Sequence, residues 1–228
     1  MAERKRKRYE LTDILIAILI TELRKEINYL DVLSFDELSA PRITVLTKNM
    51  VNRLLKNNKK AYIKIAKEAS EEAADDVKEL TGIAVKPLKT DEAFVAGILS
   101  AYNPTTGYLY EPEADRKRAR LAEALIAAVL FGLRAEYHKE LQKFANLWHT
   151  QTKQYTITVV DTARIETFKK NGIRRVRWET QNDERVCGEC HDRDGKIYNI
   201  DNLPEKHYGC RCWLVPVREK DKGNNGES

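Results

Sequence analysis

The sequence predicts a mostly α-helical protein, with an elongated helical N-terminal body and a small α+β module at the C-terminal end. Three observations predict this class. Helix-forming residues dominate up to about residue 150, apolar residues recur there at helical spacing, and all four cysteines gather in the last fifth of the chain. We therefore expect a helical body over residues 11–150 and a separate C-terminal domain over residues 151–217.

Composition limits the possibilities further. The chain has 228 residues, 42% of them hydrophobic and 33% charged, which suits one large or two smaller domains with an apolar core. The net charge of +5 is mild, but residues 4–8 are five consecutive cations. Such a run favours nucleic-acid phosphate or another acidic surface, or else is a solvated, idle terminus. We expect disordered tails at residues 1–10 and 218–228.

The apolar run at residues 14–20 follows the basic start and superficially resembles a secretory signal. However, Glu10 and Asp13 interrupt the pattern, no small-residue cleavage site follows, and the run is too short to span a bilayer. We interpret it as a buried helix face, with no membrane partner. A reducing, cytosolic setting follows, where clustered cysteines bind metal more often than they form disulfides.

Apolar periodicity predicts several helices in the body and one beyond it. The expected ranges are 11–33, 41–55, 61–80, 91–101, 112–147 and 151–170. Asn171-Gly172 then predicts a stop, and the alternation over 173–180 predicts a strand. A second basic run, residues 116–120, lies inside a predicted helix, so we expect a solvated face with acidic neighbours rather than a phosphate site.

The cysteines have the spacing of a metal site. A C-x-x-C pair, Cys187 and Cys190, is followed by an H-x-x-C-x-C run, His207, Cys210 and Cys212. Thiolates and imidazole are the ligands that zinc prefers in closed tetrahedra. Five candidates compete for four positions, and the fourth ligand is either His207 or Cys212, because alternate residues of an extended chain point to opposite faces.

A structural zinc is favoured over a catalytic one. Candidate ligands outnumber the coordination positions, and no carboxylate is obviously placed as a general base. His191 follows the first pair directly and is expected near the site or on the surface. Free or disulfide-bonded cysteines are the alternative. So short a module buries little core of its own, so we expect its fold to depend on the ion.

Other functions depend on particular residues. The sequence contains no dinucleotide, P-loop or G-x-S-x-G motif, so we expect no enzyme, no catalytic residues and no organic cofactor. A zinc nuclease would need His191 as its base, with Asn199 as a supporting amide. A nucleic-acid-binding zinc protein would use the arginines at 174, 175 and 177 beside Trp178, although Trp178 is better explained as packing next to the metal.

A series of ordered motifs runs through the C-terminal region. They are residues 163–167, 176–180, 183–187 with Cys190, 194–196, and His207 with 210–212. In this order they resemble the phage Mu protein F-like minor head proteins, a family of head morphogenesis proteins of tailed bacteriophages. The resemblance covers roughly residues 155–217. Two positions depart from the family pattern: Ile165 replaces a usual threonine, and Tyr208 replaces a usual proline.

The resemblance implies a structural minor protein of the phage head, made in the host cytoplasm and present in a few copies within an assembly. Such proteins associate with the portal vertex or the inner capsid face, and they assist head assembly and DNA packaging or ejection. The portal and the major capsid protein are the implied partners. Packaged DNA, or an acidic surface of the portal, is the implied partner of the basic N-terminus.

Overall fold

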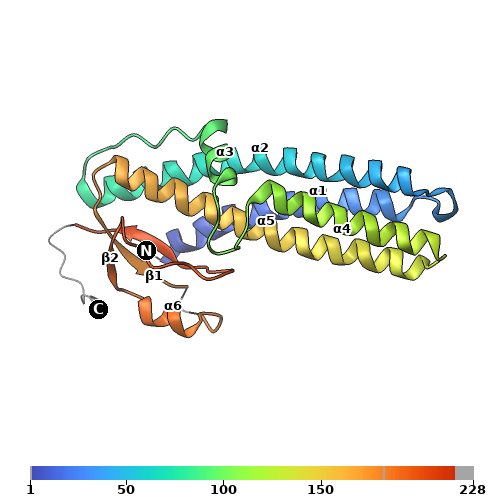
Figure 1. The fold of residues 1–228 in the computed structure, drawn as a ribbon. Coiled ribbons are helices and arrows are strands. Elements are labelled where there is room, and N and C mark those ends of the chain that lie inside the picture. The colour runs from blue at the N-terminus through green and yellow to red at the C-terminus, as the bar shows by residue number, and fades with distance from the viewer. Residues whose placement is uncertain (1, 182, 219–228) are drawn as a thin grey trace. The chain divides into compact units, whose positions relative to one another are not determined.

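The structure, a computed structural model, describes residues 2–181 and 183–218, with side chains from Asp13 onward. The described residues form six α-helices, one short 3-10 helix and a three-stranded sheet (Figure 1). The helices are α1 (Ala2–Asp31), η1 (Phe35–Glu37), α2 (Ala40–Thr81), α3 (Glu92–Ser100), α4 (Tyr110–Leu130), α5 (Arg134–Lys170) and α6 (Gly188–Arg193). The strands are β1 (Arg175–Glu179), β2 (Ile197–Asn199) and β3 (Trp213–Pro216). The expected mostly α class with a small C-terminal sheet is confirmed.

The helix boundaries differ from expectation at the two ends of the chain. The first helix, expected from about residue 11, begins at Ala2, so its backbone includes the basic run at 4–8. The side chains of that run lie outside the described residues. Of the expected tail at 218–228, only Arg218 is described, and its guanidinium donates to the carbonyl oxygen of Leu80 at 2.7 and 2.9 Å.

Two expected breaks between helices are absent, because α5 continues without interruption across residues 148–150 and α2 continues across residues 56–60. The two helices expected at 41–55 and 61–80 form a single helix, α2, that continues through Asn57 and Asn58. Asn58 is buried, and its Nδ2 donates to the Tyr110 hydroxyl at 2.8 Å and to Thr152 Oγ1 at 3.3 Å. These tertiary hydrogen bonds satisfy a residue that would otherwise favour a turn, because asparagine side chains compete for backbone groups.

One break was missed. The pattern expected to run from 112 to 147 is divided at Gly132, between α4 and α5. Gly132 has a φ of +67°, its N–H donates to Val129, and the next N–H, of Leu133, donates to Ala128. This pair of hydrogen bonds is the glycine-dependent helix end known as the Schellman motif. The apolar periodicity continues across it, so periodicity alone conceals the turn.

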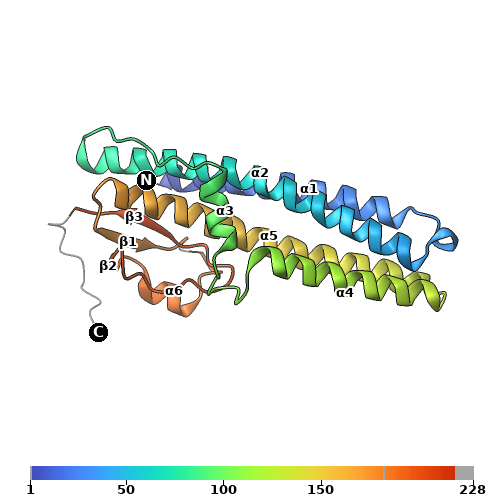
Figure 2. The same ribbon diagram turned by 45° about the horizontal axis from the view of Figure 1, so that its top comes forward.

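The chain divides into two compact units, and α2 and α5 each contribute to both. Unit 1 contains residues 1–62, 99–103 and 107–156. Within it, α1, the first part of α2, α4 and the first part of α5 lie side by side as a bundle (Figures 1 and 2). Their shared core includes Ile27, Met50, Leu54, Leu125 and Leu141, each at most 3% exposed.

Unit 2 contains residues 63–98, 104–106 and 157–228. Its sheet has the order β2-β1-β3, with both pairs antiparallel, and Trp178 lies opposite Leu214. The strand expected at 173–180 is confirmed as β1. The core combines Val77 of α2, Phe168 of α5 and the sheet residues Val176 and Trp178 with three of the cysteines. The cysteine region therefore forms part of the core of this unit.

A buried ion pair joins the elements of unit 2. Arg164 of α5 donates to Asp76 of α2 at 2.6 Å and to the carbonyl oxygen of Leu214 in β3 at 3.2 Å. The two charged side chains are 5% and 6% exposed. Close by in the sequence, the hydroxyls of Thr167 and Ser70 lie 3.0 Å apart. These polar contacts fix the register between α2, α5 and β3.

Two further features bear on function. Among the described residues, no helix is apolar over a long enough stretch to cross a membrane.

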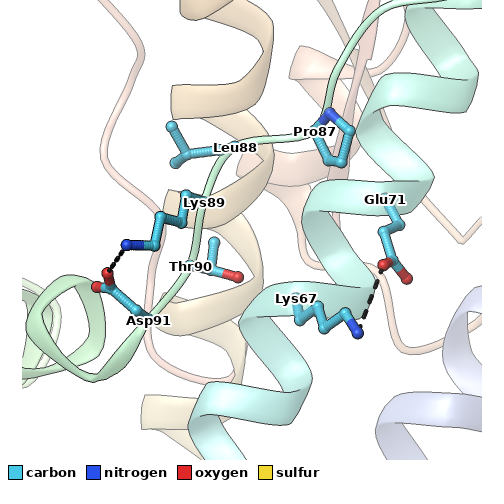
Figure 3. A pocket seen from close by; sticks show the side chains of 7 residues that line it. All are labelled: Lys67, Glu71, Pro87, Leu88, Lys89, Thr90 and Asp91. Atoms are coloured by element: carbon cyan, nitrogen blue, oxygen red, sulfur yellow. Dashed lines mark ion pairs between the residues drawn. The ribbon is translucent and has the colours of Figure 1, made fainter.

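A cavity of about 240 Å³ lies in unit 2, where residues 87–91 pass α2 (Figure 3). Its charged lining residues pair with one another, Lys67 with Glu71 at 3.9 Å and Lys89 with Asp91 at 3.0 Å. Their charges are thus compensated within the cavity.

Candidate metal centre

The first pair of cysteines is positioned by α6. Cys187 is the N-cap of this helix, and its Sγ accepts the backbone N–H of Cys190 at 3.5 Å. A cap residue and the third residue of a helix lie on the same side of the first turn, so both sulfurs face one point. Cys187 is exposed, whereas Cys190 is buried. The short helix thus presents two thiols at the edge of the core.

The second group is positioned by a tight turn before β3. The N–H of Cys210 donates to the carbonyl oxygen of His207 at 3.1 Å, and Gly209 supplies the positive φ of +71° that the turn requires. The chain then extends through Cys212 into Trp213 of β3. Because the chain turns directly before Cys210, both Cys210 and Cys212 are buried in the same cluster.

The five predicted ligand residues form two overlapping groups of three that share Cys190. The donor atoms of Cys187, Cys190 and His207 lie within 4.8 Å of one another, as do those of Cys190, Cys210 and Cys212. His207 Nε2 is 3.2 Å from the Cys187 sulfur and 3.1 Å from the Cys190 sulfur, and the sulfurs of Cys190 and Cys210 are 3.7 Å apart. Zinc–ligand bonds of about 2.3 Å to sulfur and 2.05 Å to nitrogen give tetrahedral edges of about 3.8 and 3.6 Å. The two groups share Cys190, so a single four-ligand site requires donor atoms of both groups to approach one another to these lengths.

The orientation of the His207 ring suits a ligand. Nδ1 lies 2.9 Å from the carbonyl oxygen of Tyr208, which is the contact of a protonated Nδ1. Nε2 then carries the lone pair and faces the sulfurs. Metal-binding histidines are commonly oriented by such a hydrogen bond from the other ring nitrogen. Tyr208, which replaces the usual proline of the resembled family, supplies the accepting carbonyl here.

The thiols have unequal acidities. Burial raises the pKa of Cys190 to about 12. The side-chain hydrogen bond between Cys210 and Cys212 lowers the pKa of Cys210 to about 5, against the effect of burial, and raises that of Cys212. These opposite shifts favour the protonated thiol at Cys190 and Cys212 and the thiolate at Cys210. A dication would displace protons from any buried thiol that it binds.

Zinc binding is therefore expected to strengthen as the pH rises. Because the ion must displace at least the proton of Cys190, the apparent affinity should increase about tenfold per pH unit for each proton displaced. Competition titrations with a chromophoric chelator between pH 6 and 8 would measure this slope. An affinity that stays constant over this range would show that the buried thiols are not ligands.

An ion pair joins the segment before the first ligand pair to the segment that carries the last two cysteines. Arg211, between the last two cysteines, donates to both carboxylate oxygens of Asp183 at 2.8 and 2.5 Å. Asp183 also accepts the N–H of Arg185 at 3.1 Å, which shapes the approach to Cys187. The Arg211 guanidinium holds the pKa of Asp183 below its usual value. The first and second ligand pairs are thus joined through residues outside the cluster.

Two residues considered for other functions lie in positions that do not suit those functions. The side chain of His191 is 82% exposed and belongs to neither of the two donor groups. Trp178 is completely buried, with Arg193 and Lys206 at 5.4 and 5.6 Å from its ring centroid. A tryptophan without exposed surface offers no platform on which a base could stack. Its expected packing beside the cysteines is confirmed by their shared core.

The second basic run lies among acidic neighbours, as expected. Glu113, which is buried, pairs with both Arg116 and Lys117, and Asp115 pairs with Arg118 at 2.7 Å. Lys117 also donates to the side chain of Gln151 at 2.7 Å. These three cations are therefore engaged within the protein, which disfavours the alternative of a phosphate site.

Sequence reasoning missed the residues that support the cluster. Lys206 donates to Asp161 of α5 at 2.8 Å and to the carbonyl oxygen of Cys212 at 2.6 Å. Arg193 donates to the carbonyl oxygen of Glu205 at 3.0 Å. Lys206 adjoins His207 in the sequence, which is a weak signal. Asp161, 45 residues away, has no local signature at all.

The fold and the cluster define a class: a mostly helical protein in which unit 2 carries a Cys/His group that could hold a metal. Residues 119–215 match the family model described as "Phage Mu protein F like protein", and the family is one of phage head morphogenesis proteins. The match confirms the resemblance and extends it from about residue 155 back into α4. The searches of curated proteins and of solved structures found no match.

Proposed function

We propose that this protein is a structural minor head protein of a tailed bacteriophage. In this proposal one structural zinc ion stabilises the fold of unit 2. The observation that carries the proposal is the location of the Cys/His cluster, residues 187–212, inside the segment that matches the family. In this proposal the protein is made in the host cytoplasm and becomes part of the phage head. There it associates with the portal vertex or inner capsid and assists head morphogenesis and DNA packaging or ejection.

The proposed zinc ligands are Cys187, Cys190 and Cys210, with His207 or Cys212 in the fourth position. The distances from His207 Nε2 to the first two sulfurs favour His207. A closed set of four protein ligands leaves no coordination position for a substrate, so we propose a non-catalytic role. The exposure of His191, the only spare histidine beside the cluster in sequence, supports this role because a base would need to approach the metal.

An apolar tip on unit 1 supports an assembly role. The turns α1–α2 and α4–α5 lie at the same end of this unit (Figures 1 and 2), joined by a hydrogen bond from Tyr137 to the carbonyl oxygen of Leu30 at 3.1 Å. Val32, Leu130 and Phe131 are 79%, 73% and 76% exposed there. Large exposed apolar residues that gather in one place mark interaction sites. We propose that a portal or major capsid protein covers this tip.

The basic run at residues 4–8 is the proposed contact for packaged DNA or for an acidic surface of the portal. Its side chains lie outside the described residues, so this part of the proposal is supported by the sequence alone. Five adjacent cations would bind phosphate with a strong dependence on salt.

Incorporation into heads tests the assembly role. In a phage whose own copy carries Leu130→Asp and Phe131→Asp, purified heads should contain at least tenfold less of the protein than wild-type heads, by quantitative mass spectrometry. Charged groups would disrupt an apolar contact while remaining solvated in the free protein, so expression should not change. Ile83→Asp, at a residue of unit 2 that is 68% exposed, is the matched control. Normal incorporation of the double variant would refute the tip as a contact, and absence of the wild-type protein from heads would refute the function.

A further inference from the structure

The segment that leads into the second ligand group is held by three other parts of unit 2. Arg193 of α6 donates to the carbonyl oxygen of Glu205, and Thr105 Oγ1 donates to that of Lys206, each at 3.0 Å. The Lys206 side chain in turn reaches Asp161 of α5 at 2.8 Å. The backbone directly before His207 is therefore fixed by contacts that include no ligand residue.

Lys206 also closes the ligand loop on itself. Its Nζ donates to the carbonyl oxygen of Cys212 at 2.6 Å, so one ammonium bridges the position before His207 and the last cysteine. The side chain is only 14% exposed, and its partner Asp161 is 19% exposed. A lysine so nearly buried needs partners for its charge, and here it has a carboxylate and a carbonyl. His207 and Cys210 lie between the two positions that it joins.

The charge of Lys206 has the sign that the proposed centre needs. A zinc ion bound by three thiolates and one imidazole carries a net negative charge, and one bound by four thiolates carries more. Burying that charge at the edge of a core is costly unless a cation lies near it.

We propose that Lys206, anchored by Asp161 of α5, is a positioning residue for the metal site: it holds the His207–Cys212 loop in the conformation that binds the ion and compensates the charge of the bound centre. This inference rests on the proposed zinc site. It assigns to α5 an indirect part in metal affinity, through the contact of Asp161 with Lys206, although α5 carries no ligand.

The test is the zinc affinity of the full-length chain, measured by competition with a chromophoric chelator. Lys206→Met and Asp161→Asn should each bind zinc about 10- to 100-fold more weakly than wild type, the usual effect of removing a residue that supports a ligand. The double variant should lose little more than either single variant, because both substitutions remove one contact. Lys206→Arg should keep most of the affinity. Lys169→Met, which removes a 2.9 Å pair with Asp201 elsewhere in unit 2, is the control and should bind as wild type does.

The outcomes separate the two proposals. A wild-type chain that binds no zinc would refute the zinc site itself. A wild-type chain that binds zinc, together with Lys206→Met or Asp161→Asn at wild-type affinity, would refute the positioning role alone. If Lys206→Met fails to fold by circular dichroism, Asp161→Asn decides the question, since it leaves the ligand loop unchanged. A loss in Lys206→Arg as large as in Lys206→Met would contradict the role of the charge.

Discussion

The substitution Cys187→Ser is expected to unfold the region around the sheet and α6 while leaving the helices of unit 1 intact. Three of the four cysteines are part of the core of unit 2, and the sheet residues in that core are few. In small modules of this kind the free energy of zinc binding is largely the free energy of folding, about 10–16 kcal/mol in zinc-finger peptides. The loss of one of four ligands should therefore remove most of the stability of this region.

Limited proteolysis followed by mass spectrometry would measure this effect. Cleavage should concentrate between residues 171 and 217 in the variant and spare α1, α4 and the first part of α5, and the helical circular dichroism signal should fall only slightly. His191→Ser is the matched control, because His191 lies in the same short helix with its side chain in solvent. A Cys187→Ser chain as resistant to protease as the control would contradict a structural role for the cysteine.

The second large effect is expected at the buried ion pair of Arg164 and Asp76. Replacing Arg164 by Ala removes the guanidinium that pairs with the buried carboxylate of Asp76, and it also removes the hydrogen bond to Leu214 of β3. Breaking a buried pair from one side typically costs about 3–5 kcal/mol, whereas replacing both partners by apolar residues can be nearly neutral. Arg164→Ala should therefore lower the free energy of unfolding by about 3–5 kcal/mol, and Arg164→Met with Asp76→Leu should recover most of it.

Urea unfolding of the zinc-loaded protein, followed by tryptophan fluorescence, would report this difference. The exposed pair of Lys89 and Asp91 provides the comparison, since Lys89→Ala should change the stability by less than about 1 kcal/mol. If Arg164→Ala were no more destabilising than Lys89→Ala, the pair would not be what joins α2, α5 and β3.

The sequence was informative where a local pattern has one physical solution. The spacing of Cys187, Cys190, His207 and Cys210 predicted their convergence because a helix N-terminus and a tight turn both bring such residues together. Asn171-Gly172 likewise predicted the end of α5. At Gly132 the apolar period continues across the turn. At Asn58 the buried hydroxyl of Tyr110 accepts a hydrogen bond from a side chain that would otherwise favour a turn. The contact of Asn58 is tertiary and lies outside any local window, whereas the turn at Gly132 is closed by local hydrogen bonds and is concealed by the continuing apolar period.

The support around the cluster was beyond sequence reasoning for the same reason. Asp161 and Lys206, or Asp183 and Arg211, are ordinary surface-type residues until the fold brings them together. Their partners are 45 and 28 residues away along the chain. A charged residue predicts a partner of opposite sign but does not indicate which one. The ligands of a metal site have specific spacing, whereas the residues that position the ligands do not.

The central claim is that the Cys/His cluster binds one zinc ion, and that the fold of unit 2 around the sheet and α6 depends on this ion. Elemental analysis of the purified chain, before and after chelation, combined with limited proteolysis of both samples, tests it most directly. The expected result is about one zinc per chain, with protease resistance around the sheet and α6 lost on chelation and restored by added zinc. A chain that contains no zinc, or one that keeps the same resistance after its zinc is removed, would contradict the account.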